Sequence, residues 1–203
     1  YFYINSAPWL PSRFSDRAVT EGQRKFMGTL QNTYAFWTLY AEIDQFNPMN
    51  YKLEDCKLSV MDKFILSKLN TMVRGVDNNL GAYKIPEAAK CLSSFVDELS
   101  NWYVRRSRER FWGTEMTEDK IAAYMTLYTC LVTTAKAGAP MIPFMAEDIY
   151  RNLVCTVDSD APVSVHFCDF PEWDAAMIDE TLEDEMEFIL DAVSKEKCTI
   201  VWL

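Results

Sequence analysis

The sequence predicts an all-α protein, namely an antiparallel helix bundle with a short irregular or extended C-terminal appendage. Three observations indicate this fold. Several long stretches carry apolar residues at steps of three and four, which is the period of an amphipathic helix. The chain of 203 residues contains only 6 Gly and 8 Pro, which favours long regular elements over many turns. Short connections join the helical stretches, as they do in antiparallel bundles.

The first two helices are long. The first is expected from Ser15 to Ile43, and the pair Asn47-Pro48 breaks the pattern after it. The second is expected from Ser59 to about Leu80, with Gly81 as a helix-stop signal. In the second stretch the apolar residues alternate steps of four and three over its whole length, which predicts one continuous buried face.

Three more helices are expected after Gly81. The third begins with Pro86 in its first turn, where proline is favoured, and runs to about Trp112. The fourth begins after Thr117, an N-cap residue that is followed by acidic side chains suited to a helix N-terminus, and reaches Ala135 before "GAPMIP" ends it. A short fifth helix covers Phe144 to Val154.

The pattern changes beyond Cys155. The motif "VSVHF" alternates as a short strand or extended segment does, and Asp158 to Asp191 is dense in carboxylates. We expect this part to be a solvated, peripheral stretch. The domain organisation is then a connector over 1–14, a helix bundle over 15–154 and an acidic C-terminal appendage over 155–203, whose last ten or so residues are atypical.

Composition excludes several classes of protein. With 20 Lys+Arg against 30 Asp+Glu the formal net charge is −10, so any contact with nucleic acid must be local. The sequence has no run of eighteen apolar residues and no signal-peptide pattern, and its lack of an initiator Met suggests a piece of a longer protein. Six cysteines without CxxC spacing predict reduced thiols and no metal site: Cys56, Cys91, Cys130, Cys155, Cys168 and Cys198.

Catalytic constellations are absent from the sequence. The one histidine, His166, lies in the alternating "VSVHFCDF", where a structural imidazole is favoured over a catalyst. Neither GxGxxG nor GxxxxGK[ST] occurs, so no phosphate-binding loop is expected. Adjacent acids such as Glu147 and Asp148 point apart on a helix and do not make a hydrolytic pair. No catalytic residue is therefore predicted.

The stretch "SNWYVRRSRERFWG", Ser100 to Gly113, places four arginines in an acidic chain. At 100° per residue Trp102 and Tyr103 fall on the buried face of the third helix. Arg106 and Arg110 fall at the edge of that face, where we expect them to pair with carboxylates of neighbouring helices while their stems cover apolar surface.

The opposite side of this helix carries Asn101, Arg105 and Arg108, which are suited to phosphate oxygens and base edges, and Trp112 beside them could stack an unpaired base. A solvated polar face, with Asp97 and Arg105 neutralised by local pairs, accounts for these residues equally well. The composition does not decide between RNA binding and plain solvation.

A resemblance to a known family bears on that choice. The run "FVDELSNWYVRRSRERFW", Phe95 to Trp112, resembles the corresponding helix of isoleucyl-tRNA synthetases of the bacterial type. "SAPWLPSRFS" is similar to the segment that follows their catalytic domain, "MDKFILSKLNTMV" to their second bundle helix, and "DKIAAYMTLYTCLVTTAKAGAPMIPFMAEDIYRNL" and "SVHFCDFPEWD" to their later run. The tail "SKEKCTIVWL" departs from the family.

The resemblance implies the anticodon-binding domain of a class Ia synthetase, which docks on the anticodon stem and loop of tRNA-Ile. It also implies that ATP and Mg belong to a catalytic domain of the same chain upstream of Tyr1, that no cofactor binds here, and that the protein is cytoplasmic and monomeric. The alternative is a non-catalytic helical domain for protein interaction or structure. The residues assigned to tRNA binding are Asn101, Arg105, Arg108 and Trp112, and those assigned to structure are Trp102, Tyr103, Arg106 and Arg110.

Overall fold

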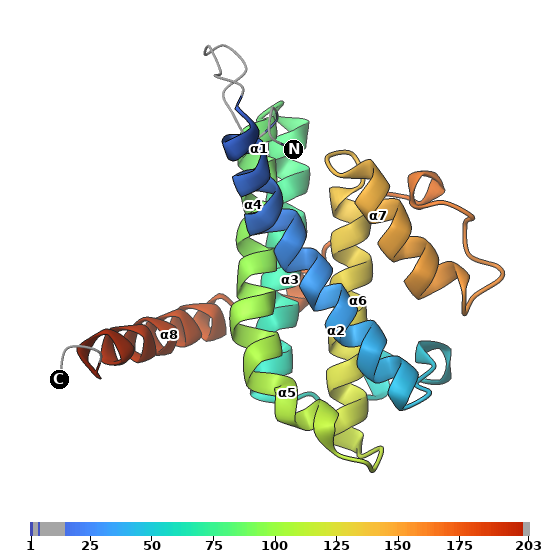
Figure 1. Cartoon of the computed structure of the whole chain (residues 1–203). Helices are drawn as coiled ribbons and strands as arrows, with labels where there is room; N and C mark the ends of the chain where they lie inside the picture. The colour runs from blue at the N-terminus through green and yellow to red at the C-terminus, as the bar shows by residue number, and fades with distance from the viewer. Residues whose placement is uncertain (2–3, 5–14, 201–203) are drawn as a thin grey trace.

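The fold is all-α, as predicted, with no strand in the part of the chain that the structure describes. The computed structural model describes Tyr1, Ile4 and residues 15–200, with side chains up to Val193. Most of the expected connector over 1–14 and the side chains of the atypical tail therefore lie outside the described residues. Figure 1 shows long helices packed side by side, and one further helix that leaves the bundle at its edge.

The first expected helix, 15–43, is confirmed. It is formed by α1 (Asp16–Gly22), a π-helical turn (Gln23–Met27) and α2 (Gly28–Ile43), which follow one another without a break. Ser15 caps its start, because its side chain accepts a hydrogen bond from the Ala18 amide. Two short 3₁₀ turns, Pro48–Asn50 and Leu53–Asp55, then lead to the next helix.

The second helix, α3 (Val60–Gly81), begins with a capping box. Ser59 accepts a hydrogen bond from the Asp62 amide, and the Asp62 carboxylate accepts one from the Ser59 amide, so two backbone donors that the helix leaves unpaired are satisfied. The helix ends at Gly81, as expected. The left-handed residue of the turn is nevertheless Tyr83, with a φ of 59°, and not the glycine. Pro86 lies in the first turn of α4 (Ile85–Glu98).

The third helix is also continuous over its expected length. It comprises α4, a π-helical turn (Leu99–Val104) and α5 (Arg105–Trp112). A π-helical turn contains one residue more than an α-helical turn, so it moves every later side chain by one position around the helix. The buried residues before the turn are Leu92, Phe95 and Val96, those within it are Leu99, Tyr103 and Val104, and those after it are Ser107 and Phe111. Beyond Tyr103 the buried face is therefore rotated relative to a projection at a constant 100° per residue.

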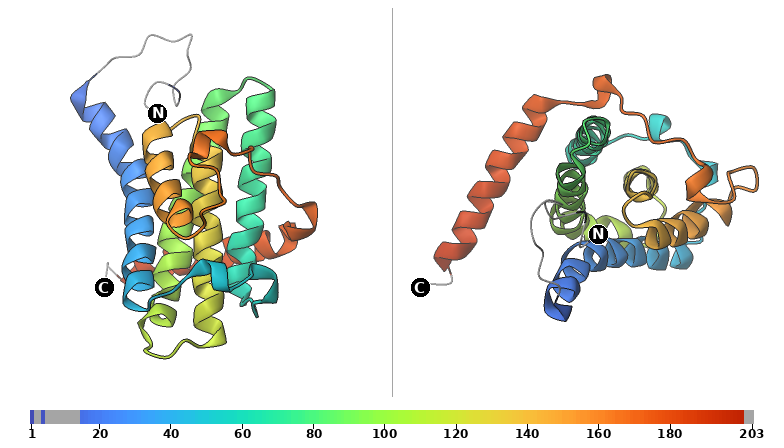
Figure 2. Two further views of the ribbon diagram at one scale, coloured as in Figure 1. Left: turned by 90° about the vertical axis from the view of Figure 1, so that its right-hand side faces the viewer. Right: turned by 90° about the horizontal axis from the view of Figure 1, so that it is seen from above.

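The last two bundle helices are α6 (Glu118–Gly138) and α7 (Pro143–Tyr150), the latter extended by a π-helical turn (Arg151–Cys155). Thr117 caps α6 as predicted, because its side chain accepts from the Lys120 amide. The central helix α6 packs against α3, α2, α5 and α7. Figure 2, in the view from above, shows it surrounded by these neighbours.

The core is a single cluster between these helices. Its largest fully buried side chains include three tyrosines, and aromatic contacts join α5 and the segment after α2 to α6: Phe111 meets Tyr124 edge-on at 4.8 Å, and Phe46 stacks on Tyr124 at 4.4 Å. The indole nitrogen of Trp37 donates to the Tyr124 carbonyl at 3.1 Å. Burial of such large rings is the main favourable term that holds the bundle together.

Two expectations for the C-terminal part are corrected. Within "VSVHF", Ser164 is extended but Val165–Phe167 form a 3₁₀ turn and not a strand, because Glu147 of α7 accepts hydrogen bonds from the Ser164 hydroxyl and the Val165 amide and holds the segment against the bundle. A second 3₁₀ turn (Ala175–Met177) follows. Within the acidic stretch a helix begins, α8 (Glu180–Ile200), which the sequence analysis did not predict.

The helix α8 is peripheral, as expected of this stretch, but it is anchored to α3. Glu183 is buried and accepts hydrogen bonds from the hydroxyls of Ser67 and Thr71. The Ser67 hydroxyl also accepts from the Asp179 amide at 2.8 Å. From this anchor α8 points away from the bundle, as Figure 1 and the view from above in Figure 2 show. Glu183 is therefore not a solvated carboxylate.

Candidate nucleic-acid interface

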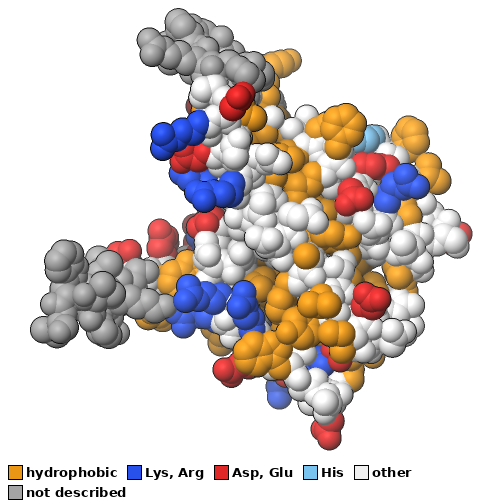
Figure 3. Space-filling view, in the orientation of Figure 1, with side chains coloured by type: hydrophobic (Ala, Val, Ile, Leu, Met, Phe, Trp, Pro, Cys, Tyr) orange, Lys and Arg blue, Asp and Glu red, His pale blue; other side chains and the backbone are white. Residues whose placement is uncertain are grey.

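The four residues assigned to RNA binding are all exposed on the helix formed by α4, the π-helical turn and α5. The structure brings Asn101, Arg105, Arg108 and Trp112 to one side of this helix, and we call them the outward stripe. In the space-filling view of Figure 3, Lys and Arg side chains gather along this helix, with hydrophobic side chains beside them toward α2. The indole of Trp112 is 57% exposed, which is high for the largest apolar side chain.

The polar side chains of the outward stripe differ in their hydrogen bonding. The Asn101 amide donates to Asp97 Oδ1 at 2.7 Å, so this side chain is held locally. No hydrogen bond or ion pair of Arg105 or Arg108 is found among the residues that the structure describes. Their guanidinium groups therefore present their donors to solvent, where an incoming phosphate can accept two of them at once.

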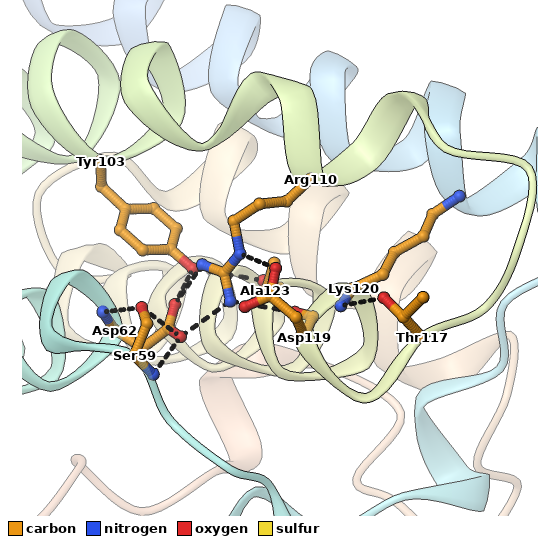
Figure 4. A network of polar contacts seen from close by, with 8 residues as sticks. All are labelled: Ser59, Asp62, Tyr103, Arg110, Thr117, Asp119, Lys120 and Ala123. Atoms are coloured by element: carbon orange, nitrogen blue, oxygen red, sulfur yellow. Dashed lines mark hydrogen bonds and ion pairs between the residues drawn. The ribbon is translucent and has the colours of Figure 1, made fainter.

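Arg110 points the other way, into the bundle (Figure 4). Its Nη1 and Nη2 donate to the two carboxylate oxygens of Asp62 at 2.8 and 2.9 Å, and its Nε donates to Asp119 Oδ2 at 2.8 Å. Asp62 comes from α3 and Asp119 from α6, so this one side chain joins three helices. The expected pairing of Arg110 with carboxylates of neighbouring helices is present in the structure.

Asp62 is the centre of this network and was not singled out in the sequence. Its side chain is fully buried, and besides Arg110 it accepts hydrogen bonds from the Tyr103 hydroxyl at 2.6 Å and from the Ser59 amide and hydroxyl. Burial alone would raise the pKa of Asp62, but the hydrogen bonds from Arg110 and Tyr103 outweigh it and hold that pKa below its ordinary value. The carboxylate is therefore ionised and fully paired.

Tyr103 lies in the core, as the apolar stripe predicted. Burial, followed by the negative charge of Asp62, raises the pKa of its hydroxyl well above the ordinary value, so the phenol stays neutral and donates to Asp62. For Arg110 burial acts in the opposite direction, but the hydrogen bonds to Asp62 and Asp119 raise its pKa above the ordinary value. Neutral phenol, carboxylate and guanidinium form one satisfied buried group.

Arg106 is placed differently from the expectation. Its side chain is exposed, and its guanidinium carbon lies 5.1 Å from the centre of the Trp102 ring in a cation–π contact. The carboxylate partner predicted for it is not found in the described part of the chain. The reason is the π-helical turn, which rotates the buried face so that Ser107 is buried and Arg106, expected at the edge of that face, lies in solvent.

A second buried charge also escaped the sequence analysis. Lys120 is 2% exposed, pairs with Asp44 and donates to the Gly113 carbonyl. The Tyr124 hydroxyl donates to the same Asp44 carboxylate, and burial, together with this hydrogen bond, raises the pKa of Tyr124. The signal available for Asp62 was the spacing Ser59-x-x-Asp62 ahead of an apolar run, a capping box, whereas Lys120 gave no comparable signal.

The described residues contain no group of three or more His, Cys, Asp or Glu side chains arranged to hold a metal ion. The five cysteines whose state the structure gives are free thiols, and Cys130 is buried in the core. In the same part of the chain, none of the helices combines the length and the apolar character that a membrane span requires.

Comparison with known proteins agrees with this geometry. Residues 62–198 match the family model described as the anticodon-binding domain of tRNA ligase. The chain is 59% identical over 187 residues to the isoleucine–tRNA ligase of Clostridium novyi, covering 92% of this chain and 18% of that protein. It is 53% identical to the ligase of Clostridium acetobutylicum, covering 95% and 19%, and 45% identical to that of Bacteroides fragilis, covering 96% and 17%.

The chain thus spans about a fifth of the length of the relatives it matches. The matched region begins at Asp62, near the start of α3, and reaches most of α8, so it includes the outward stripe as well as Asp62, Arg110 and Asp119. A general helical interaction domain, the alternative that the sequence left open, does not account for this match. The chain belongs to the family of anticodon-binding domains of tRNA ligases.

Proposed function

We propose that this chain is the tRNA-recognition part of an isoleucine–tRNA ligase and that it binds the anticodon stem and loop of tRNA-Ile without catalysing a reaction itself. The observation that carries the proposal is the outward stripe: two arginines without a partner in the described structure, next to an exposed indole. The identity of 45–59% to relatives named isoleucine–tRNA ligase supports the choice of the tRNA.

Each residue of the stripe has a chemical task in this proposal. The planar guanidinium groups of Arg105 and Arg108 bind phosphate oxygens with two parallel hydrogen bonds each. The Trp112 indole stacks on an unpaired base of the loop. Asn101 keeps its side-chain oxygen for a base or ribose donor while its amide is held by Asp97.

The Arg110 network supports this task from the other side of the helix. It fixes α5 to α3 and α6 through charge-assisted hydrogen bonds, so the outward stripe does not have to be ordered when RNA binds. Less conformational entropy is then lost on association. The net charge of −10 disfavours RNA on the rest of the surface and restricts docking to this side.

The rest of the ligase reaction belongs, in this proposal, to other parts of the enzyme. Attachment of isoleucine to tRNA uses ATP and Mg²⁺, and we place both in a catalytic domain of the same protein. The chain itself has neither a phosphate-binding loop motif nor a pair of catalytic groups. We place the enzyme in the cytoplasm, as a monomer.

The test is to replace Arg105 or Arg108 with Ala in the full-length ligase. Each loses one phosphate contact, so kcat/KM for tRNA-Ile should fall by roughly 10-fold, which corresponds to a charge-assisted hydrogen bond of about 1.5 kcal/mol. The slope of log Kd against log salt should become shallower by about 0.7–0.9 per arginine. The melting temperature should stay unchanged, because neither side chain has a partner in the described fold.

Arg151→Ala is the matched control, because Arg151 is an exposed arginine that follows α7 on another part of the bundle. It removes the same charge and should change neither kcat/KM nor the salt slope by more than about twofold. Equal effects from Arg151 and Arg105 would mean that only the net charge matters, and unchanged kinetics at Arg105 and Arg108 would refute the assignment.

A further inference from the structure

The outward stripe has an apolar neighbour on α2. Leu39 and Ile43 are 55% and 65% exposed, although both belong to a helix whose other large apolar side chains are buried or half-buried. Isolated exposed apolar residues are ordinary on a protein surface, whereas several that lie together beside polar groups indicate a binding surface. The position of these two residues relative to Trp112 follows from the packing of α2 against α5.

The contacts of Phe111 show which side of α2 faces α5. The Phe111 ring lies 5.1 Å from the Phe36 ring and 6.3 Å from the Tyr40 ring, so these two residues mark the side of α2 that faces α5. Leu39 is three residues from Phe36, and Ile43 is three residues from Tyr40. Residues three apart on a helix lie next to each other, so Leu39 and Ile43 flank the contact with α5 on its solvent side.

The contacts of Arg110 show on which side of α5 Arg108 and Trp112 lie. Arg110 points to α3 and α6, and at about 100° per residue Arg108 and Trp112 lie roughly opposite to it. The side of α5 that faces away from α3 is the side next to α2, since Phe111 packs on that helix. Trp112 and Arg108 therefore border the α2–α5 junction from one side, and Leu39 and Ile43 border it from the other.

We infer that Leu39, Ile43 and Trp112 form an apolar platform that receives an unstacked nucleobase of an RNA loop while Arg105 and Arg108 hold the adjacent phosphates. This inference rests on the proposed function and adds α2 to the RNA-binding surface. The occupant is an unpaired base for two reasons. A base offers a flat apolar face bonded to an anionic backbone, and the platform is an apolar surface bordered by cationic side chains without a partner in the described fold.

The charges around the platform agree with this occupant. Asp44 follows Ile43 directly but is occupied by Lys120 and Tyr124 on the inner side of the helix. Glu42 is also exposed, but it is rotated by about 100° from Ile43 toward the far side of α2. On α5 the carboxylate is that of Glu109, which is exposed and lies four residues after Arg105, on the same side of the helix. The junction itself therefore does not present a carboxylate from α2 to an incoming phosphate.

The decisive experiment compares two RNAs with the full-length protein. One is the anticodon stem–loop of tRNA-Ile, and the other is the same stem–loop with abasic nucleotides in the loop, which keeps every phosphate and removes the bases. Leu39→Ala combined with Ile43→Ala should weaken binding of the normal loop by about 3- to 30-fold, the range expected for losing the burial of two aliphatic side chains on a base. It should leave binding of the abasic loop unchanged.

Three comparisons make this result specific. Trp112→Ala should also act only on the normal loop, by about 5- to 100-fold. Arg105→Ala should weaken both RNAs and reduce the salt dependence. Phe144→Ala is the apolar control, because Phe144 is 91% exposed on α7, away from the α2–α5 junction, and should affect neither RNA. Alanine is a good helix former, so these exposed replacements keep the fold.

Failure of the inference can be told apart from failure of the proposed function. If the Leu39/Ile43 variant binds both loops as the unchanged protein does, or weakens both equally, the platform is not a base-binding surface even though salt-dependent RNA binding persists. If that variant lowers the melting temperature or aminoacylation without changing RNA binding, the patch is a contact to another part of the protein. If no RNA binds in a salt-dependent manner, the proposed function fails and the inference fails with it.

Discussion

Replacing Asp62 with Asn tests whether the Arg110 network holds the RNA-binding helix in place. The change keeps the size and shape of the side chain but removes its charge. Asp62 is fully buried and accepts from Arg110, Tyr103 and Ser59, so the variant leaves a guanidinium without its principal partner and sets a new amide donor against existing donors. Loss of one member of a buried ion pair costs about 3–5 kcal/mol.

The expected cost is smaller here, because Arg110 is not completely enclosed. Its side chain is 16% exposed and keeps the hydrogen bond to Asp119, whose own side chain is 58% exposed. We therefore expect the free energy of unfolding to fall by about 2–4 kcal/mol. For a chain of this size each kcal/mol lowers the melting temperature by about 2–4 °C, so a decrease of roughly 4–16 °C is expected.

The assay is urea unfolding followed by circular dichroism, with Asp119→Asn as the matched control. Asp119 contacts the same guanidinium from a largely exposed position, so its loss should cost less than about 1 kcal/mol. The combination of Asp62→Asn with Arg110→Gln should be less destabilising than the sum of the two single changes, because the pair then leaves no uncompensated charge. A cost for Asp62→Asn no larger than that for Asp119→Asn would refute the reasoning.

The pH dependence gives an independent check of the same side chain. Its pKa is lower in the folded protein than in the unfolded chain, where it is about 3.9, despite the opposing effect of burial. The ionised carboxylate therefore contributes stability above about pH 4, and this contribution is lost as the pH falls through the folded value. The difference in unfolding free energy between the unchanged protein and Asp62→Asn should shrink below about pH 4, and a difference that does not depend on pH would contradict the assignment.

Two further predictions concern residues whose position in the structure differs from the one predicted from the sequence. Arg106→Ala should lower the free energy of unfolding by no more than about 0.5–1 kcal/mol, which is the value of an exposed cation–π contact. A loss above about 2 kcal/mol in urea unfolding would instead indicate that Arg106 pairs with a carboxylate. Glu183→Ala should cost about 1–3 kcal/mol and act on α8 rather than on the whole bundle, because Ser67 and Thr71 lose a buried acceptor. Hydrogen exchange of the amides in residues 180–193 measures how often α8 opens in the variant. Glu185→Ala, at an exposed position of the same helix, is the control. Equal protection from exchange in both variants would argue against the anchor.

Much of the bundle was predictable because its signals are local. The start of the fourth helix follows from Thr117, the first turn of the third from Pro86, and the break after the first from Asn47-Pro48; the structure confirms all three. The helix α8 was missed because its dense carboxylates indicate a solvated stretch. What holds α8 is the tertiary contact of Glu183 with two hydroxyls of α3, and the local sequence does not contain that contact.

The candidate site was predictable only in part, because one turn of the helix is π-helical. A constant 100° per residue correctly placed Arg105 and Arg108 in solvent and Arg110 at a neighbouring carboxylate, but it also placed Arg106 at the edge of the buried face with a carboxylate partner. The π-helical turn Leu99–Val104 contains one residue more than an α-helical turn, and periodicity has no means of showing it, because Leu, Tyr and Val are compatible with both.

That same extra residue shapes the surface. It makes Tyr103 and Val104 both buried, gives the next core position to the small Ser107, and leaves Arg106 in solvent on the Trp102 ring. Three of the four arginines are thereby exposed in a chain of net charge −10, while the fourth fixes the helix to α3 and α6. In a regular α-helix Arg106 would lie with Arg110 at the edge of the buried face, where a second guanidinium would need a carboxylate of its own, at a cost in desolvation. The irregular turn therefore lets one short segment act as structural support and as a cationic surface.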